Sequence, residues 1–559
     1  MQHRRTAFLA LSLLSACAAT NPGVGDAQAQ PGQGLTDYLV GHAAAARGDM
    51  ATAADRLGAA AASDPANQDL ATQAFLTGLL AGRSRLGALA ARVPGNPLAQ
   101  LYLADEQARA GHWDAAERRY AAMPERGLTG AVRPLLVAWA QQGAGRTDAA
   151  LATLKPLTAS GQNLNPIYVL HMALIADQAG RAGDAAELYR AAQVAFGGLN
   201  LRLGVILASA DARRGLRDQA EQTLSALVAA NTDLAIARPA LDAAIAQPAV
   251  PRPVDGIAES YLAFAAALRD TGAGEIAEAL LRLALLDRPD LTAARLLLSE
   301  VEDAAKQPQA ALATLRAVPA TDPLHAVVAL RETVLLDETG DHAGAVALAA
   351  SVAREYPARP EPVAQEGEAL RMEGQFAEAA TAYGEAIARA EALGAVPWTL
   401  YFERGVSRER AGDWPGAQTD LEHAVQIAPD QPTVLNFLAY SWAERHEHLP
   451  RAHEMLERAV AINPTDGSIV DSLGWVLLRE GDTQGALAQL ERAVELEPED
   501  PVINGHLGDA YLAAGRRREA EYQWRRALIL QPKDEDKARI EAKLNDLGAA
   551  AGGPASGRP

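Results

Sequence analysis

The chain has 559 residues, of which 49% are hydrophobic, 22% charged and only 5% aromatic. This length exceeds one ordinary core and the composition is too apolar for a disordered chain, so several domains or an extended array are expected. The formal charge of −19 argues against a nucleic-acid partner, whose phosphates require a basic face, and the single cysteine excludes disulfides and cysteine metal sites.

The first residues have the three-part form of an export signal: a basic start, an apolar run over 7–14 and small residues before Cys17. A signal peptide is therefore predicted over 1–16, too short to span a membrane as a mature helix. The stretch Leu14-Ser15-Ala16-Cys17 resembles the lipobox of bacterial lipoproteins, which implies lipidation of Cys17. Position 18 is alanine instead of the aspartate associated with inner-membrane retention, so the resemblance implies an outer-membrane lipoprotein facing the periplasm. An ordinary signal with a chance cysteine is the alternative.

Residues 17–34 are rich in Gly, Pro, Gln, Ala and Asn and show no apolar periodicity. They are predicted to form a flexible tether after the lipidated cysteine, with a reach on the order of 20 Å by random-coil scaling.

One pattern then recurs every 34 or 35 residues. Its landmark alanine occurs in the last four copies at Ala417, Ala452, Ala486 and Ala520. A second alanine follows seven residues later, a proline closes each copy, and glycine occupies many of the turns. Weaker copies extend upstream to about residue 35, and the alternation typical of strands is missing. The spacing predicts about fourteen helix pairs.

This pattern resembles the tetratricopeptide repeat (TPR), a 34-residue helix–turn–helix, and the resemblance implies an all-α superhelical solenoid. The last copy carries the signature most fully, with Gly508, Tyr511, Ala520, Trp524 and Pro532. Small residues are needed where the two helices cross closely, large ones fill the space between neighbours, and proline stops the second helix.

The rhythm breaks at the proline-rich stretch 247–256, which is predicted to link an N-terminal lobe, 35–246, to a C-terminal lobe, 257–532. One long loop within a continuous superhelix is the alternative. Residues 533–548 predict an amphipathic, outwardly polar capping helix, which the end of a solenoid requires. The tail, 549–559, is predicted to be disordered.

The motifs of common enzymes are missing from the sequence: no GxxxxGK[ST], HExxH or GxSxG stretch occurs. The best metal candidate is the group His446, His448 and His453, but its spacing fits no standard metal motif, and the repeat register places it in a turn and the start of the next helix. We therefore expect a non-enzymatic protein with no catalytic residue, no metal and no cofactor.

In a TPR array the first helices line the concave face, and the repeat register defines their inward positions. In the last four units these positions hold aromatic and short polar residues: Phe402, Glu403, Asn436, Phe437, Tyr440, Asp471, Ser472, Trp475, His506 and Asp509. Rigid aromatics beside polar groups are typical anchors for a protein or peptide. The alternative for Phe437 and Trp475 is simple core packing. The Lys/Arg/Asn clamp of chaperone-binding TPR domains is absent, which makes a free C-terminal carboxylate a poor ligand.

The last ~100 residues, with "DGSIVDSLGW" and "HLGDAYLAAGR", resemble proteobacterial TPR outer-membrane lipoproteins. Some members of that group are adaptors that bind a periplasmic carboxyl-terminal processing protease and bring it substrates. The resemblance implies a membrane-anchored scaffold or adaptor whose partners are proteins or peptides. Two alternatives stay open: an assembly lipoprotein of a secretion, pilus or exopolysaccharide export machine, and an enzyme subunit with an unrecognised site in the concave groove.

The lipobox generates the first testable prediction. Cys17→Ser should abolish acylation and release the protein from the membrane fraction, because acyl chains need the cysteine sulfur and amino group for attachment. Incorporation of radiolabelled palmitate is the measurement, with Thr20→Ser as a control that keeps the label. Label in the Cys17→Ser protein would contradict the lipoprotein interpretation.

Overall fold

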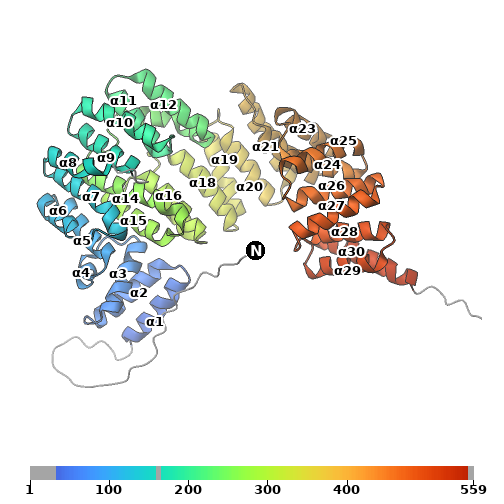
Figure 1. Cartoon of the computed structure of the whole chain (residues 1–559), viewed down its shortest axis with the longest axis horizontal. Helices are drawn as coiled ribbons and strands as arrows, with labels where there is room; N and C mark the ends of the chain where they lie inside the picture. The colour runs from blue at the N-terminus through green and yellow to red at the C-terminus, as the bar shows by residue number, and fades with distance from the viewer. Residues whose placement is uncertain (1–32, 159–164, 552–559) are drawn as a thin grey trace, which may run out of the picture. The chain divides into compact units, whose positions relative to one another are not determined.

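A computed structural model describes residues 33–158 and 165–551 (Figure 1). All regular structure in these two ranges is helical. The predicted signal peptide 1–16, Cys17, nearly all of the tether 17–34 and most of the tail 549–559 lie outside them. Residues 33 and 34, assigned to the tether, instead begin the first helix. None of the helices described is both long and apolar enough to cross a bilayer.

The first part of the chain contains α1 (Gln33–Ala46), α2 (Met50–Ser63), α3 (Gln68–Leu80), α4 (Gly87–Arg92), α5 (Pro97–Arg109), α6 (Trp113–Ala121), α7 (Gly127–Gly143), α8 (Thr147–Thr158), α9 (Asn165–Gln178), α10 (Ala182–Phe196), α11 (Leu201–Arg213), α12 (Arg217–Ala230), the 3₁₀ helix η1 (Thr232–Ala237) and α13 (Arg238–Ala244).

The remainder contains α14 (Pro253–Leu268), the 3₁₀ helix η2 (Arg269–Thr271), α15 (Gly274–Asp287), α16 (Thr292–Ala304), α17 (Pro308–Arg316), α18 (His325–Glu338), α19 (His342–Glu355), α20 (Glu361–Met372), α21 (Phe376–Ala392), α22 (Trp398–Arg410), α23 (Trp414–Ile427), α24 (Pro432–Arg445), α25 (Leu449–Ile462), α26 (Gly467–Glu480), α27 (Thr483–Leu496), α28 (Pro501–Ala513), α29 (Arg517–Ile529) and α30 (Asp534–Ala551).

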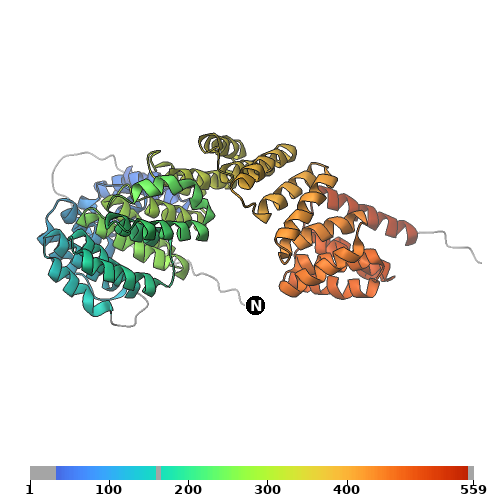
Figure 2. The same ribbon diagram turned by 90° about the horizontal axis from the view of Figure 1, so that it is seen from above.

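Within the described ranges these helices form fourteen pairs, α1–α2 to α11–α12 and α14–α15 to α28–α29. Within the second unit the pairs from α18–α19 to α28–α29 stack in chain order, and within the first unit α1–α2 to α7–α8 do the same (Figure 2). The predicted fold class, an all-α TPR solenoid of about fourteen helix pairs, is confirmed. The helix α30 occupies the place of the expected capping helix and packs on α29.

The chain divides into two compact units, and this division differs from the predicted lobes. The described part of the first unit comprises 33–155 together with 253–265 and 278–289, and the second unit comprises the rest. Within the predicted linker 247–256, α14 begins at Pro253. Proline suits the first turn of a helix, where its missing N–H has no partner to lose. Whether the halves of the chain fold separately stays a prediction.

Small residues sit where the two helices of a pair cross. The four landmark alanines are fully buried. A Cβ atom added to Gly474 would lie 2.6 Å from the side chain of Leu490, and one added to Gly508 would lie 2.4 Å from the indole of Trp524. Only a hydrogen fits at these glycines, because interiors are packed to the density of crystals.

The turns inside the pairs need left-handed backbone. Gly481 ends α26 with φ +91°, a conformation that glycine adopts without the steric cost of a Cβ. In the α24–α25 turn, His446 and His448 adopt this backbone with φ +54° and +46°. These two side chains are exposed, as expected from the repeat register.

Arginines of the second helices fix the stacking of one repeat on the next in the C-terminal part. Arg458 donates to the carbonyl oxygen of Pro429 at 2.8 Å, and Arg526 donates to that of Pro498 at 3.0 Å. Arg492 makes the same contact with Pro464. Each bond joins a helix to the closing proline of the preceding unit, and hydrogen bonds to a charged donor are stronger than neutral ones.

The space around a glycine predicts whether its replacement by alanine stabilises or destabilises the protein. Gly508→Ala should lower the free energy of unfolding by about 1–3 kcal/mol, because overpacking against the buried indole of Trp524 outweighs the helix propensity gained. Gly384→Ala is the matched control. It lies inside α21, where the nearest atom to an added Cβ is the mobile end of Arg404 at 3.6 Å, so stability should rise by up to about 1 kcal/mol. Urea unfolding measures both; equal effects would contradict the role of close approach.

Candidate binding groove

The first helices of the last four units bring most of the predicted groove residues into contact. The rings of Phe402 on α22 and Phe437 on α24 meet edge to face at 5.7 Å between centroids. Trp398, which the sequence analysis did not select, packs against Phe402 at 6.0 Å. Trp398, Phe402 and Phe437 remain half-buried, so part of each ring faces solvent. They form an aromatic row from the start of α22 to the middle of α24.

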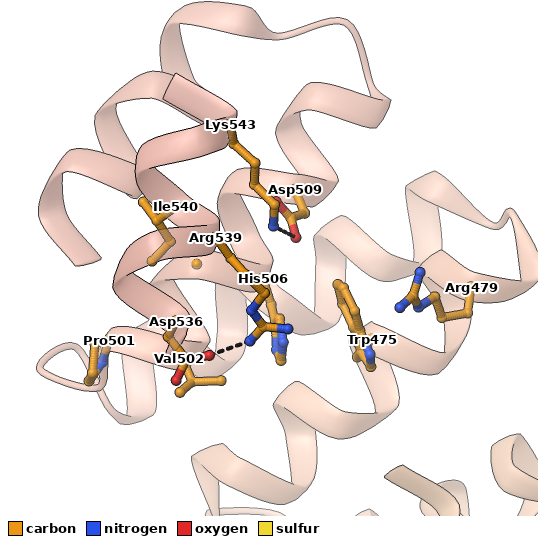
Figure 3. A pocket seen from close by; sticks show the side chains of 11 residues that line it. Trp475, Arg479, Pro501, Val502, His506, Asp509, Asp536, Arg539, Ile540 and Lys543 are labelled. Atoms are coloured by element: carbon orange, nitrogen blue, oxygen red, sulfur yellow. Dashed lines mark hydrogen bonds and ion pairs between the residues drawn. The ribbon is translucent and has the colours of Figure 1, made fainter. Parts of the chain in front are cut away.

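A second aromatic group joins α24, α26 and α28. The rings of Trp475 and His506 stack at 4.1 Å with an interplanar angle of 19°, and Tyr440 lies 6.2 Å from His506. The guanidinium of Arg479 lies 4.4 Å from the Trp475 ring. Figure 3 shows the indole between His506 and Arg479. One face of the indole meets the guanidinium of Arg479 and the other meets the imidazole of His506, which is a cation when protonated. Contacts between a cation and an aromatic face are favourable.

A buried acid fixes the imidazole of His506. Its Nδ1 lies 2.8 Å from a carboxylate oxygen of Asp471, and both side chains are buried. Burial by itself would lower the pKa of His506, but the charge and hydrogen bond of Asp471, with the charges of Asp509 and Glu444, outweigh burial and raise this pKa. The raised pKa favours the imidazolium that stacks on Trp475.

The predicted groove residues divide into a floor and a rim. Trp475 is only 6% exposed, and its Nε1 donates to Glu444 at 2.6 Å. Asp471, Ser472 and His506 are buried as well, and the Ser472 hydroxyl donates to its own helix. These four form the floor, because α24, α26 and α28 pack side by side. The half-buried rim consists of Phe402, Asn436, Phe437, Tyr440 and Asp509. A partner-binding role for either group stays a prediction.

The phenol of Tyr440 belongs to this rim and faces several charges. Burial raises its pKa, and the charges of Glu444 and Asp471 raise it further, while Arg539 opposes them. The phenol therefore stays neutral at physiological pH and can act as a hydrogen-bond donor at the surface of the groove.

A pocket of about 310 Å³ opens beside this group, between α26, α28 and α30 (Figure 3). The last helix supplies four of its lining residues: Asp536, Arg539, Ile540 and Lys543. A capping helix with an outward polar face was expected here, and the charged residues Asp536, Arg539 and Lys543 were not selected as site residues. Their spacing of three, four and seven residues from Asp536 placed them on the face of Ile540 and was the signal available.

Each cation of the pocket has an acidic neighbour in this chain. Lys543 Nζ lies 2.6 and 2.7 Å from the two carboxylate oxygens of Asp509. Arg539 pairs with Asp536, and Arg479 lies 3.8 Å from Glu444. The pocket is therefore lined by ion pairs instead of a free positive patch.

The histidines considered for a metal are not brought together as ligands. His453 pairs with Glu480 at 2.9 Å on the surface of α25, while His446 and His448 belong to the preceding turn. Across the part of the chain that the structure describes, no group of three or more His, Cys, Asp or Glu side chains has the geometry to hold a metal ion.

Comparison with known proteins supports the presence of tetratricopeptide repeats in this chain. Models of the tetratricopeptide repeat match residues 477–544 and, separately, 135–200, 365–432 and 443–501. The TPR repeat-containing protein PA4667 of Pseudomonas aeruginosa is 33% identical over 82 residues, which are 15% of this chain and 14% of that protein. The chain thus matches only a small part of this relative's length. The matched segments are tetratricopeptide repeats, and they support the TPR family for the chain.

Solved helical-repeat structures are similar at low sequence identity. The Cut9–Hcn1 complex of the APC/C is 13% identical, covers 92% of this chain and 96% of its own, and has a TM-score of 0.38. Yeast Tom70 is 12% identical, covers 81% and 96%, and has a TM-score of 0.35. A tetratricopeptide repeat protein of Parabacteroides merdae is 13% identical, covers 45% and 97%, and has a TM-score of 0.37.

The matched tetratricopeptide repeats indicate a scaffold for protein–protein interaction, built from stacked helix pairs. Of the groove residues, Phe402 lies in the matched segment 365–432, and Asp471, Ser472, Trp475, His506 and Asp509 lie between 443 and 544, whereas Asn436, Phe437 and Tyr440 fall between the matched segments.

Truncation of a floor residue should lower the free energy of unfolding more than truncation of a rim residue. Trp475→Ala should lower the free energy of unfolding by about 3–5 kcal/mol, because the indole is buried and its loss leaves Glu444 without its donor. Tyr440→Ala should cost less, about 1 kcal/mol, since part of the ring is already exposed. Thermal and urea unfolding check both values, with the exposed Glu495→Ala on α27 as a neutral control. Equal losses for the two aromatics would refute the division into floor and rim.

Proposed function

We propose that this protein is a non-enzymatic adaptor that is anchored to the outer membrane through Cys17 and binds partner proteins or peptides in the groove of α22, α24, α26 and α28. The observation that carries the proposal is the set of half-buried aromatic rings, Phe402, Phe437 and Tyr440, on the successive first helices α22 and α24. Tyr440 lies 6.2 Å from His506, which lines the pocket.

Half-buried aromatics suit the anchoring of a peptide. Their inner parts are held by packing, as Phe402 is by Phe437 and Trp398. A rigid ring loses little conformational entropy when a partner covers it, and aromatic residues contribute strongly at the centres of interfaces. The neutral hydroxyl of Tyr440 on the same rim can donate a hydrogen bond to a carbonyl oxygen of a bound main chain.

The anchoring and the pathway rest on the sequence. The lipobox before Cys17 supports membrane attachment, and the resemblance of the last ~100 residues to adaptor lipoproteins supports a role in presenting substrates to a periplasmic protease. The tether would leave the repeats free to reach into the periplasm over a distance on the order of 20 Å.

Capture of partners from crosslinked bacterial envelopes tests this function. Phe437→Ala and Tyr440→Ala in the full chain should each weaken binding by about 1–4 kcal/mol, or roughly 5-fold to several hundred-fold. Their helicity should stay intact, and Glu495→Ala should bind as the unmodified protein does. The captured proteins also distinguish an adaptor for a protease from a subunit of an export machine. Unchanged capture by both aromatic variants, with the fold intact, would place the binding surface elsewhere.

A further inference from the structure

A cluster of buried polar groups joins distant parts of the first unit, where α14 and α15 meet α5 and α6. The carboxylate of Asp105 on α5 is fully buried. It accepts a hydrogen bond from Tyr120 of α6 at 2.6 Å and bonds from Tyr261 of α14 at 2.9 and 3.1 Å. Both tyrosines are fully buried too, so water does not reach this contact.

A second buried carboxylate lies beside the first. Asp287, at the end of α15, has a fully buried side chain and accepts a hydrogen bond at 2.6 Å from Arg109 of α5. Its other oxygen, Oδ2, is buried without a hydrogen-bond partner. An ionised carboxylate with one oxygen unsatisfied in a dry interior is costly, whereas a protonated carboxyl group is not charged.

Among the described residues, the charges that act most strongly on the pair, apart from Arg109, are negative. From α5 the acid Glu106 adds negative potential at Asp105, and from α14 the buried Asp255 adds negative potential at Asp287. The ring of Tyr102 lies 5.5 Å from the guanidinium of Arg109. Farther along the same contact, two acids have arginines of their own: Glu259 lies 3.3 Å from Arg288, and Glu278 lies 3.8 Å from Arg282. Arg109 is thus the cation that serves both Asp105 and Asp287.

Close packing keeps this contact dry. Gly256 of α14 lies against Trp139 of α7, and an added Cβ would come within 2.2 Å of the indole. Trp139 is fully buried. The two surfaces therefore fit closely at this point, and the buried side chains of Asp105 and Asp287 are shielded from bulk water.

We propose that this contact is a proton-linked clamp: Asp105 and Asp287 hold one proton between them while α14 and α15 are docked, and the proton passes to water when they separate. In the docked state one guanidinium balances one carboxylate, and the other acid is neutral. After separation both acids are hydrated and ionised. Mild acid therefore tightens the clamp, and a rise in pH loosens it.

The pKa directions of the two acids agree with this geometry. Burial raises the pKa of Asp105 to about 6, although Tyr120, Arg109 and Tyr261 oppose the rise. Burial, followed by the charge of Asp105, raises the pKa of Asp287, although Arg109 lowers it. An exposed aspartate titrates near 4. Since the docked state holds the proton more tightly, its stability is fully present below about pH 4 and falls as pH rises through about 6.

Hydrogen exchange in the full chain tests the clamp. Peptides from 253–289 are followed by mass spectrometry between pH 4.5 and 7, with correction for the intrinsic exchange rate. Protection should fall with rising pH, by up to about tenfold per pH unit, since one proton is released per opening. Asp287→Asn, which keeps the shape without the charge, should remove most of this slope and equal or exceed the original protection at pH 7. Protection that does not change with pH, or an unchanged slope in Asp287→Asn, would overturn the proposal.

Two further variants keep the test decisive. Asp114→Asn removes an exposed acid of α6 that pairs with Arg146, and it should leave the slope unchanged. If Asp287→Asn fails to fold, Tyr261→Phe replaces it, because it removes only the hydroxyl that stabilises charged Asp105. Its loss of protection should be larger at pH 7 than at pH 4.5, and an equal loss at both values would also overturn the proposal.

Discussion

The close crossing of the two helices in each pair is the constraint on which the C-terminal groove depends. At Gly474 and Gly508 the facing side chains, Leu490 and Trp524, leave room for no more than a hydrogen atom. A crossing this close fixes the rotation of the first helix about its own axis, since turning it would bring larger residues into the contact. The rotation in turn decides which side chains of α26 and α28 reach the groove. Packing between helices thus controls the surface that a partner would meet.

The groove combines this packing with hydrogen bonds and ion pairs made inside the protein, while Asn436 Oδ1 and Asp471 Oδ1 are buried without a hydrogen-bond partner. Trp475 lies between His506 and Arg479, and Glu444 accepts a hydrogen bond from its indole. The same side chains that position the floor also limit how much of it a partner can touch. Binding energy must come mainly from the rim, because a ring that is already buried has little surface left to desolvate.

The first unit departs from the rule that a solenoid repeat contacts only its neighbours. Tyr261 and Asp105 are 156 residues apart in the chain, and Arg109 and Asp287 are 178 apart, yet each pair is hydrogen-bonded. Closing such long loops costs chain entropy, and the contact that offsets this cost contains buried charge. A contact of this composition responds to pH in a way that an apolar one would not.

The sequence by itself determined the repeat: the helix pairs, the glycine turn at Gly481 and the amphipathic helix near residue 540 follow from spacings within about 34 residues. It also selected the inward positions of α22 to α28, because the repeat register is local. Only the tertiary structure decided that Trp475 belongs to the floor while Tyr440 keeps an exposed edge, and that Arg539 and Lys543 line the pocket. It alone placed α14 and α15 against α5. The physical reason is that periodicity along the sequence shows which face of a helix is covered. It does not show which element covers that face, because that element lies about 30 or about 170 residues away and its position depends on how the packed helices meet.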